Sequence, residues 1–141
     1  MNNTISPQIS TTTLKKVLVI NDSVQTHQAF KMMLNRYKCE TITALNGQIG
    51  LNQLTDNSGV NLLIVDMNMP HMSGMEFIRR VKEQNTYDHI PIIAISSDSM
   101  LCDANEVSAL AQGNLRKPFT SSELHAMIER LFPQDICALC A

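Results

Sequence analysis

The sequence predicts an α/β protein with a doubly wound, five-stranded parallel sheet and five helices, arranged in three layers. Three observations predict this class. Short apolar, β-branched runs alternate with segments of helical spacing, and the runs do not alternate between apolar and polar residues. Successive runs also lie far enough apart to hold a helix. In such a fold right-handed crossovers leave the ligand site at the carboxyl ends of the strands.

Five apolar runs predict the strands. They are Val17–Ile20, a weaker Cys39–Ala44, Leu62–Val65, Ile92–Ile95 and a short Asn114–Arg116. The runs end at residues 20, 44, 65, 95 and 116, so at least 21 residues separate each end from the next. A crossover between parallel strands needs about a dozen residues or more, so every interval has room for one helix.

Apolar residues at helical spacing predict three of the helices. The stripes are Phe30, Met33, Leu34 and Tyr37; Phe77, Ile78 and Val81; and Leu124, Met127, Ile128 and Leu131. The segment Thr120-Ser121-Ser122-Glu123 has the pattern of a capping box and predicts the start of the last helix. The other two helices, near Gly47–Thr55 and Ser99–Ala111, are less periodic.

Length and composition predict one domain. The chain has 141 residues, of which 44% are hydrophobic and 17% charged, with a net charge of −2. These values exclude a disordered chain and a polycationic nucleic-acid binder. The longest strongly apolar runs have four residues, far below the ~20 of a membrane helix. We expect a cytoplasmic protein with a flexible leader at 1–14, a domain at 15–132 and a tail at 133–141.

Cysteine and histidine give no metal or redox pattern. Cys137 and Cys140 form a CxxC pair, but in the tail, without the strand and helix of a redox motif or the further ligands of a zinc site. The histidines share no metal-ligand spacing, and we expect them at the surface or on a helix face. They are His27, His71, His89 and His125.

Polar residues whose side chains could take part in a reaction follow four of the predicted strands. Asn21 and Asp22 follow the first, Asp66 the third, Ser96 the fourth and Lys117 the fifth. Each alone has a structural explanation as a helix cap, a turn residue or a solvated charge. Because the carboxyl ends of parallel strands share one edge of the sheet, all of them are expected at one site.

Phosphoryl transfer to a carboxylate is the chemistry that needs this set. Asp22 and Asp66 can bind Mg²⁺, a hard cation that takes carboxylate oxygens and substrate phosphate. The cation and Lys117 neutralise phosphoryl oxygens, while Ser96 hydrogen-bonds another. Asp66 is the better candidate nucleophile because it follows a long apolar strand in the middle of the series, and Asp22 is the better metal ligand.

Four segments closely resemble the receiver domain of two-component response regulators, and the resemblance spans 16–132. The segments are 17–23 (VLVINDS), 62–76 (LLIVDMNMPHMSGME), 91–97 (PIIAISS) and 115–119 (LRKPF). The resemblance to chemotaxis-type single-domain receivers implies a flavodoxin-like sheet with strand order 2-1-3-4-5.

The resemblance also implies a role for each site residue. Asp66 would be the phosphoacceptor, Lys117 would contact the phosphoryl group through a cis Lys117–Pro118 bond, and Ser96 would be the switch hydroxyl. Mg²⁺ or Mn²⁺ would be held by Asp22, Asp66 and the backbone carbonyl of Asn68, with Asn21 contributing through a water molecule. Asn68 and Asp98 occupy the two positions that tune dephosphorylation, although Asp98 could equally cap a helix.

Three positions depart from the family pattern. Asn21 replaces an acid, so we expect weaker binding of Mg²⁺. Asn114 replaces the aromatic residue that rotates inward when the switch hydroxyl moves, which puts the aromatic part of the output switch in question. Ser73 replaces a frequent Asp in the loop before Gly74, a change of little weight.

The resemblance implies a sensor histidine kinase or a histidine phosphotransfer protein as phosphodonor and an unidentified protein as downstream target. It is compatible with a dimer linked to phosphorylation, whereas no contact with nucleic acid or membrane is expected. One alternative is a receiver-like docking module that works without phosphorylation. A remote one is an aspartate-dependent phosphohydrolase, disfavoured because Asp66-Met67-Asn68 lacks the second Asp of that family.

Overall fold

The computed structural model describes residues 13–69, 72–97 and 109–133. The strands are β1 (Lys16–Ile20), β2 (Glu40–Ala44), β3 (Leu62–Asp66), β4 (Ile92–Ser96) and β5 (Gly113–Arg116). The helices are α1 (Val24–Leu34), α2 (Gly47–Asp56), α3 (Gly74–Lys82) and α5 (Ser121–Leu131), with short 3-10 turns η2 (Asn35–Tyr37) and η3 (Asn85–Tyr87). Most of the helix expected at 99–111 lies outside the described residues, as do Asp98, Cys137 and Cys140.

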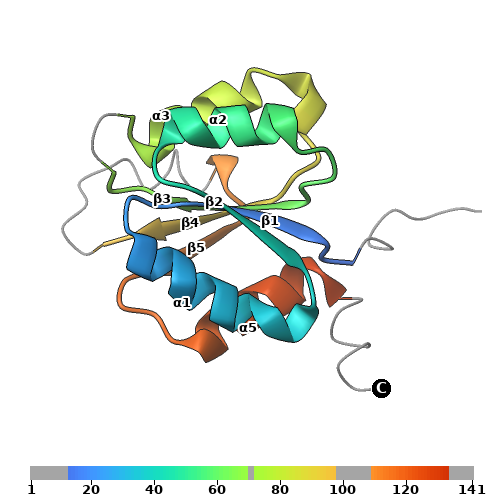
Figure 1. The fold of residues 1–141 in the computed structure, drawn as a ribbon, viewed down its shortest axis with the longest axis vertical. Coiled ribbons are helices and arrows are strands. Elements are labelled where there is room, and N and C mark those ends of the chain that lie inside the picture. Colours follow the sequence, from blue (N-terminus) through green and yellow to red (C-terminus); the bar gives the residue numbers. More distant parts are fainter. Residues whose placement is uncertain (1–12, 70–71, 98–108, 134–141) are drawn as a thin grey trace, which may run out of the picture.

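The five strands form one parallel sheet in the order β2-β1-β3-β4-β5, which confirms the prediction. Figure 1 shows α2 and α3 on one face of the sheet and α1 and α5 on the other. The register aligns the carboxyl ends of the central strands. Ile20 pairs with Val65, Asp66 with Ile95 and Ser96 with Arg116. The loops that follow these strands therefore begin side by side.

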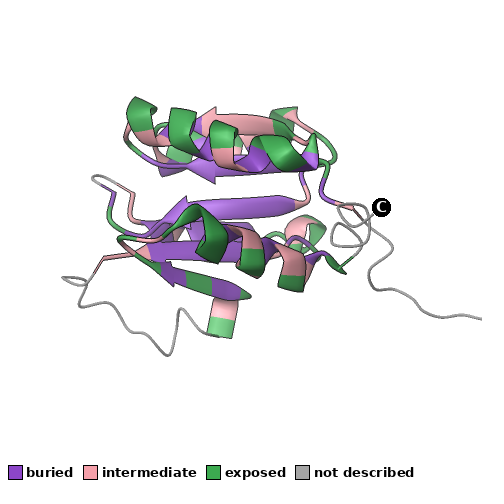
Figure 2. Cartoon of the chain, turned by 90° about the horizontal axis from the view of Figure 1, so that it is seen from below, coloured by how far each residue is buried: buried purple, intermediate pink, exposed green. Residues whose placement is uncertain are grey.

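Alternate residues of each central strand enter two separate cores. Leu18 and Ile20 pack with Phe77 beneath α2 and α3, whereas Val17 and Val19 pack with Phe30 beneath α1 and α5. Full burial of one such aliphatic side chain stabilises a fold by about 1.5–3 kcal/mol. Burial on both faces explains the unbroken apolar runs of β1, β3 and β4, which are purple in Figure 2.

The two border strands are more polar than the central ones. β2 reads Glu-Thr-Ile-Thr-Ala and only Ala44 is buried, while in β5 exposed Asn114 and Arg116 alternate with buried Gly113 and Leu115. A border strand is covered less completely, so polar residues are tolerated on it. This explains why the sequence signal for these two strands is weak.

The start of the domain differs from the prediction at Leu14. We expected this residue to end the flexible leader, but its side chain is only 3% exposed and packs in the core beneath α1 and α5. The amide of Asn61 holds the adjoining backbone. Its Oδ1 accepts hydrogen bonds from the main-chain N–H groups of Lys15 and Lys16 at 3.1 Å each, and its Nδ2 donates to the carbonyl of Thr13 at 2.7 Å. A single apolar residue beside a polar segment gave no periodicity from which this anchor could be predicted.

Among the described residues, no helix is long and apolar enough to cross a lipid bilayer.

The capping box at the start of α5 is present as predicted. Thr120 Oγ1 accepts a hydrogen bond from the N–H of Glu123 at 3.1 Å, and Glu123 Oε1 accepts one from the N–H of Thr120 at 2.8 Å. These two bonds satisfy N–H groups that the first helical turn leaves without partners.

We predict that Thr120→Ala lowers the free energy of unfolding by about 1 kcal/mol, because it removes one side of this box. Urea denaturation measures the change. Ser122→Ala, in the same exposed turn, is the control and should stay within about 0.5 kcal/mol of the unchanged protein. Equal effects of the two substitutions would mean that the box does not stabilise α5.

Candidate functional site

Asp66 lies at the carboxyl end of β3, and its side chain is only 3% exposed. Three groups from different parts of the chain donate to its carboxylate. Lys117 Nζ lies 3.2 Å from Oδ1 and 3.3 Å from Oδ2, Asn21 Nδ2 donates to Oδ2 at 3.1 Å, and the N–H of Asn68 donates to Oδ1 at 2.9 Å. The structure therefore brings together four of the residues singled out in the sequence.

A buried carboxylate of this kind needs compensation, because removing a charge from water is costly unless the charge is paired and hydrogen-bonded. Lys117 supplies the opposite charge from the loop after β5, and its side chain is 38% exposed. The ammonium group thus pairs with Asp66 while remaining within reach of a group arriving from solvent. The Lys117–Pro118 bond is cis, as the family resemblance implied.

Asn21 is buried beside Asp66, with 4% of its surface exposed. Its Oδ1 accepts a hydrogen bond from the N–H of Ser23 at 2.8 Å. Its backbone is held as well, because its N–H donates to the carbonyl of Ala44 at 3.0 Å and its carbonyl accepts from His27 Nε2 at 2.7 Å. A carbonyl can only accept, so the hydrogen bond requires a proton on Nε2 of His27.

His27 is the residue at this site that the sequence analysis missed. It is 5% exposed and lies on α1, where it fixes the main chain next to Asp22. The sequence offered one usable signal: His27 is three residues before Phe30 and seven before Leu34, which places it on the buried stripe of that helix.

The residues at this edge include oxygen donors of the kind that a hard divalent cation takes. Asp22 is exposed, follows Asn21 directly and offers a second carboxylate, and Asn68 is exposed in the loop after Asp66. Two carboxylates and a backbone carbonyl are ligands that Mg²⁺ accepts, with water and phosphate completing its shell. In the described part of the chain no group of three or more His, Cys, Asp and Glu side chains could hold a metal ion.

Ser96 and Asn114 meet across β4 and β5. Ser96 Oγ donates to Oδ1 of Asn114 at 3.3 Å, so the expected switch hydroxyl is bonded to the residue that replaces the family's aromatic one. Next to it, the N–H of Ser97 donates to Oδ1 of Asn68 at 3.2 Å. The loops after β3 and β4 are thus joined by a hydrogen bond beside Asp66. Asp98, the other predicted tuning residue, lies outside the described residues.

Gly74 allows the loop after β3 to return close to Asp66. A Cβ at this position would lie 2.5 Å from the carbonyl oxygen of Asp66 and 2.7 Å from Cα of Met67. Both are backbone atoms, which cannot move aside as the end of a flexible side chain can. The glycine of the receiver motif therefore has a steric reason in this chain: α3 begins against the residue that bears the candidate nucleophile.

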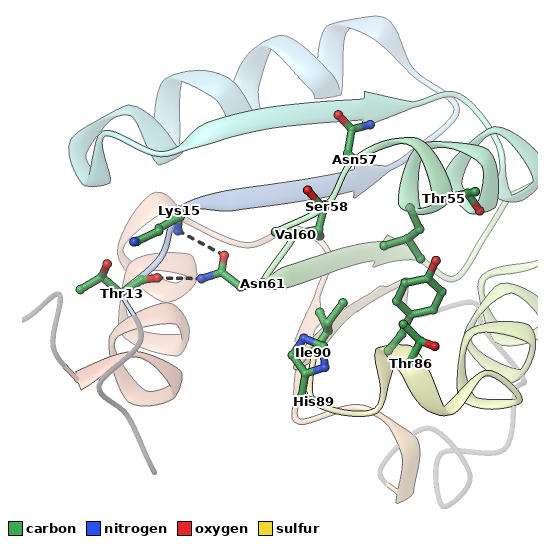
Figure 3. A pocket seen from close by; sticks show the side chains of 13 residues that line it. Thr13, Lys15, Thr55, Asn57, Ser58, Val60, Asn61, Thr86, His89 and Ile90 are labelled. Carbon is green, nitrogen blue, oxygen red and sulfur yellow. Dashed lines mark hydrogen bonds between the residues drawn. The ribbon is translucent and has the colours of Figure 1, made fainter. Parts of the chain in front are cut away.

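A separate hollow of about 700 Å³ opens near the amino ends of β1, β3 and β4. Figure 3 shows Thr13, Lys15, Asn61 and His89 around it. None of the predicted site residues lines this hollow. The hollow is therefore separate from the edge where the carboxylate, ammonium and hydroxyl groups meet.

Comparison with known proteins agrees with this geometry. A family model for the response regulator receiver domain matches residues 17–129. The chain is 32% identical over 118 residues to a chemotaxis protein CheY homolog of Campylobacter jejuni. The alignment covers 81% of this chain and 89% of that protein. Chemotaxis protein CheY1 of Helicobacter pylori is also 32% identical over 118 residues, with 81% and 94% covered.

Solved structures give the same result. The structure of Vibrio cholerae chemotaxis protein CheY4 matches with a TM-score of 0.76 at 30% identity, covering 84% of this chain and 99% of that one. The chain belongs to the response regulator receiver domain family of two-component signalling, and it resembles the single-domain, CheY-like members. Receivers of this family are typically signalling modules rather than enzymes.

We predict that Gly74→Ala lowers the free energy of unfolding by about 1–3 kcal/mol, because the new methyl group collides with backbone at Asp66 and Met67. Chemical denaturation measures the loss. Gly47→Ala is a matched control, since Gly47 also begins a helix but its Cβ would meet only the flexible side chain of Met72. A control as destabilised as Gly74→Ala would refute the steric explanation.

Proposed function

We propose that Asp66 accepts a phosphoryl group from a phosphohistidine on a sensor histidine kinase or a histidine phosphotransfer protein, and that this modification changes the binding of a downstream protein. One observation carries the proposal: Asp66 ends the central strand β3 with the Lys117 ammonium group on both of its oxygens. Membership of the receiver family supports it, because receivers of two-component systems work with histidine kinases.

The proposed transfer needs little bond-making from the rest of the protein. One oxygen of Asp66 forms a bond to phosphorus while the bond from phosphorus to the donor nitrogen breaks, and the imidazole leaves with that electron pair. Phosphoryl transfer of this loose type is accelerated mainly by position and by charge neutralisation. Lys117 supplies a positive charge beside the incoming oxygens, and the Asn68 N–H holds the carboxylate in place.

The receiver family generally uses Mg²⁺, and Asp22, Asp66 and the carbonyl of Asn68 would hold it here, with Mn²⁺ as a substitute and Asn21 contributing through water. When bound, the ion neutralises phosphoryl oxygens and relieves repulsion between the carboxylates.

The response to phosphorylation would begin at Ser96. In the resting protein its hydroxyl group bonds to Asn114. A phosphoryl group on Asp66 offers a stronger, charged acceptor, so Ser96 would exchange one partner for the other. The released Asn114 lies on the exposed side of β5, where a partner protein could sense the change. A polar side chain would thus replace the aromatic residue of the family's switch.

The phosphoacceptor is tested with acetyl phosphate and Mg²⁺, followed by intact mass measurement. We predict a mass increase of one phosphoryl group in the unchanged protein and none in Asp66→Asn, which keeps the size of the side chain but not the nucleophilic oxygen. Asp56→Asn, on an exposed position of α2, should be labelled normally. Labelling of Asp66→Asn at the normal yield would disprove the assignment.

Labelling also separates the alternatives. A modification that persists after the donor is removed supports a signalling receiver, whereas an unmodified protein that still binds its partner supports the docking module. Rapid turnover of many phosphate esters would support a phosphohydrolase.

The polar switch is tested with Asn114→Ala. We predict that the resting variant shifts about fivefold toward the conformation of the phosphorylated protein, because loss of one hydrogen bond removes about 1 kcal/mol from the resting state. NMR chemical shifts of residues 94–97, compared before and after phosphorylation, measure the shift. Asn114→Asp keeps the acceptor and serves as the control. If the resting Asn114→Ala spectrum matches that of the control at residues 94–97, the hydrogen bond to Asn114 does not hold Ser96 in the resting conformation.

A further inference from the structure

The Asn21 side chain has a fixed orientation at the site. A backbone N–H can only donate, so the hydrogen bond from Ser23 identifies the atom beside it as Oδ1 of Asn21. The NH₂ group must then face Asp66, where it donates to Oδ2 at 3.1 Å. The assignment of oxygen and nitrogen in this amide therefore follows from the network.

The surroundings prevent the amide from turning away. His27 on α1 donates to the Asn21 carbonyl, and the Asn21 N–H donates to Ala44 at the end of β2. Asn21 is also 4% exposed. The donor that faces Asp66 is thus held by three other contacts, from the loop, the helix and the neighbouring strand.

An acid at position 21 would reverse the electrostatics of this contact. A carboxylate in the same orientation would place one of its oxygens at about the present Asn21–Asp66 distance, with both groups buried. Two carboxylates so close repel each other, and in the described part of the chain the one positive side chain paired with Asp66 is Lys117. A divalent ion would therefore stabilise the site with an acid at position 21 more than it stabilises the site with the amide.

We propose that Asn21 is a positioning residue that keeps the resting site assembled without metal: its amide hydrogen bond to Asp66 performs the task that a divalent cation would perform between two acids. The resting protein then gains little from Mg²⁺, and the ion binds well only together with a phosphoryl group that brings its own oxygens. This proposal deepens the proposed function. The claim that Mg²⁺ binds well only together with a phosphoryl group rests on that function.

Thermal unfolding with and without metal tests the claim that Asn21 keeps the resting site assembled without metal. The proteins compared are the unchanged chain, Asn21→Asp and the control Asn52→Asp. The control adds the same charge on an exposed residue of α2, where Asp can still accept the hydrogen bond from Gln48. Each melting temperature is measured at neutral pH in EDTA and again in 10 mM MgCl₂.

The unchanged protein and Asn52→Asp should melt at nearly the same temperature in EDTA and in MgCl₂. Asn21→Asp should melt about 5 °C lower in EDTA and recover most of this loss in MgCl₂. Its affinity for Mg²⁺, measured by NMR titration of the unphosphorylated protein, should rise about tenfold because the site gains a charged ligand. If Asn21→Asp melts like the control in both buffers, or binds Mg²⁺ no more tightly than the unchanged protein, the proposal is wrong.

A measurement on the unchanged protein keeps the test valid even if Asn21→Asp does not fold. In EDTA the side-chain NH₂ protons of Asn21 should exchange with solvent at least tenfold more slowly than those of exposed Asn52, since the former are buried and bonded to Asp66. Equal exchange rates would overturn the proposal. None of these three measurements uses a phosphodonor, so failure of Asp66 labelling would remove the proposed function while leaving the metal-free role of Asn21 standing.

Discussion

The ion pair between Lys117 and Asp66 is the constraint on which the rest of the site depends. It joins the ends of β3 and β5, which are not neighbours in the sheet, and it places a positive charge on a buried carboxylate. Such a carboxylate is tolerated only with compensation, so the loops after β1, β3 and β5 must all converge on one point. The parallel register of the strands provides that convergence, and Gly74 leaves room for it.

Much of this arrangement could be predicted from the sequence, because it depends on periodicity and chain order. Unbroken apolar runs place β1, β3 and β4 in the interior, and a polar residue directly after such a run must lie at the sheet edge. This reasoning found Asp66, whereas Lys117 was found because it follows the shorter and more polar run that predicted β5. The family resemblance added the strand order and the cis bond, which the residue pattern alone did not contain.

Features that depend on single contacts between distant residues could not be predicted in the same way. The burial of His27 depends on a hydrogen bond to the Asn21 carbonyl, and that of Leu14 on the closure of the core beneath α1 and α5. The pairing of Ser96 with Asn114 depends on the side-chain rotamers of two residues that are 18 apart in the chain. Helical and strand periods indicate which face a residue occupies, but they do not indicate which atom its side chain reaches.

The polar character of the two border strands has a consequence for the protein at high concentration. An open sheet offers unsatisfied backbone groups along each border, and flat apolar borders recruit further strands from other molecules. Here Glu40 on β2 and Arg116 on β5 place charges along those borders. Charges on both borders thereby disfavour the pairing of this sheet with copies of itself.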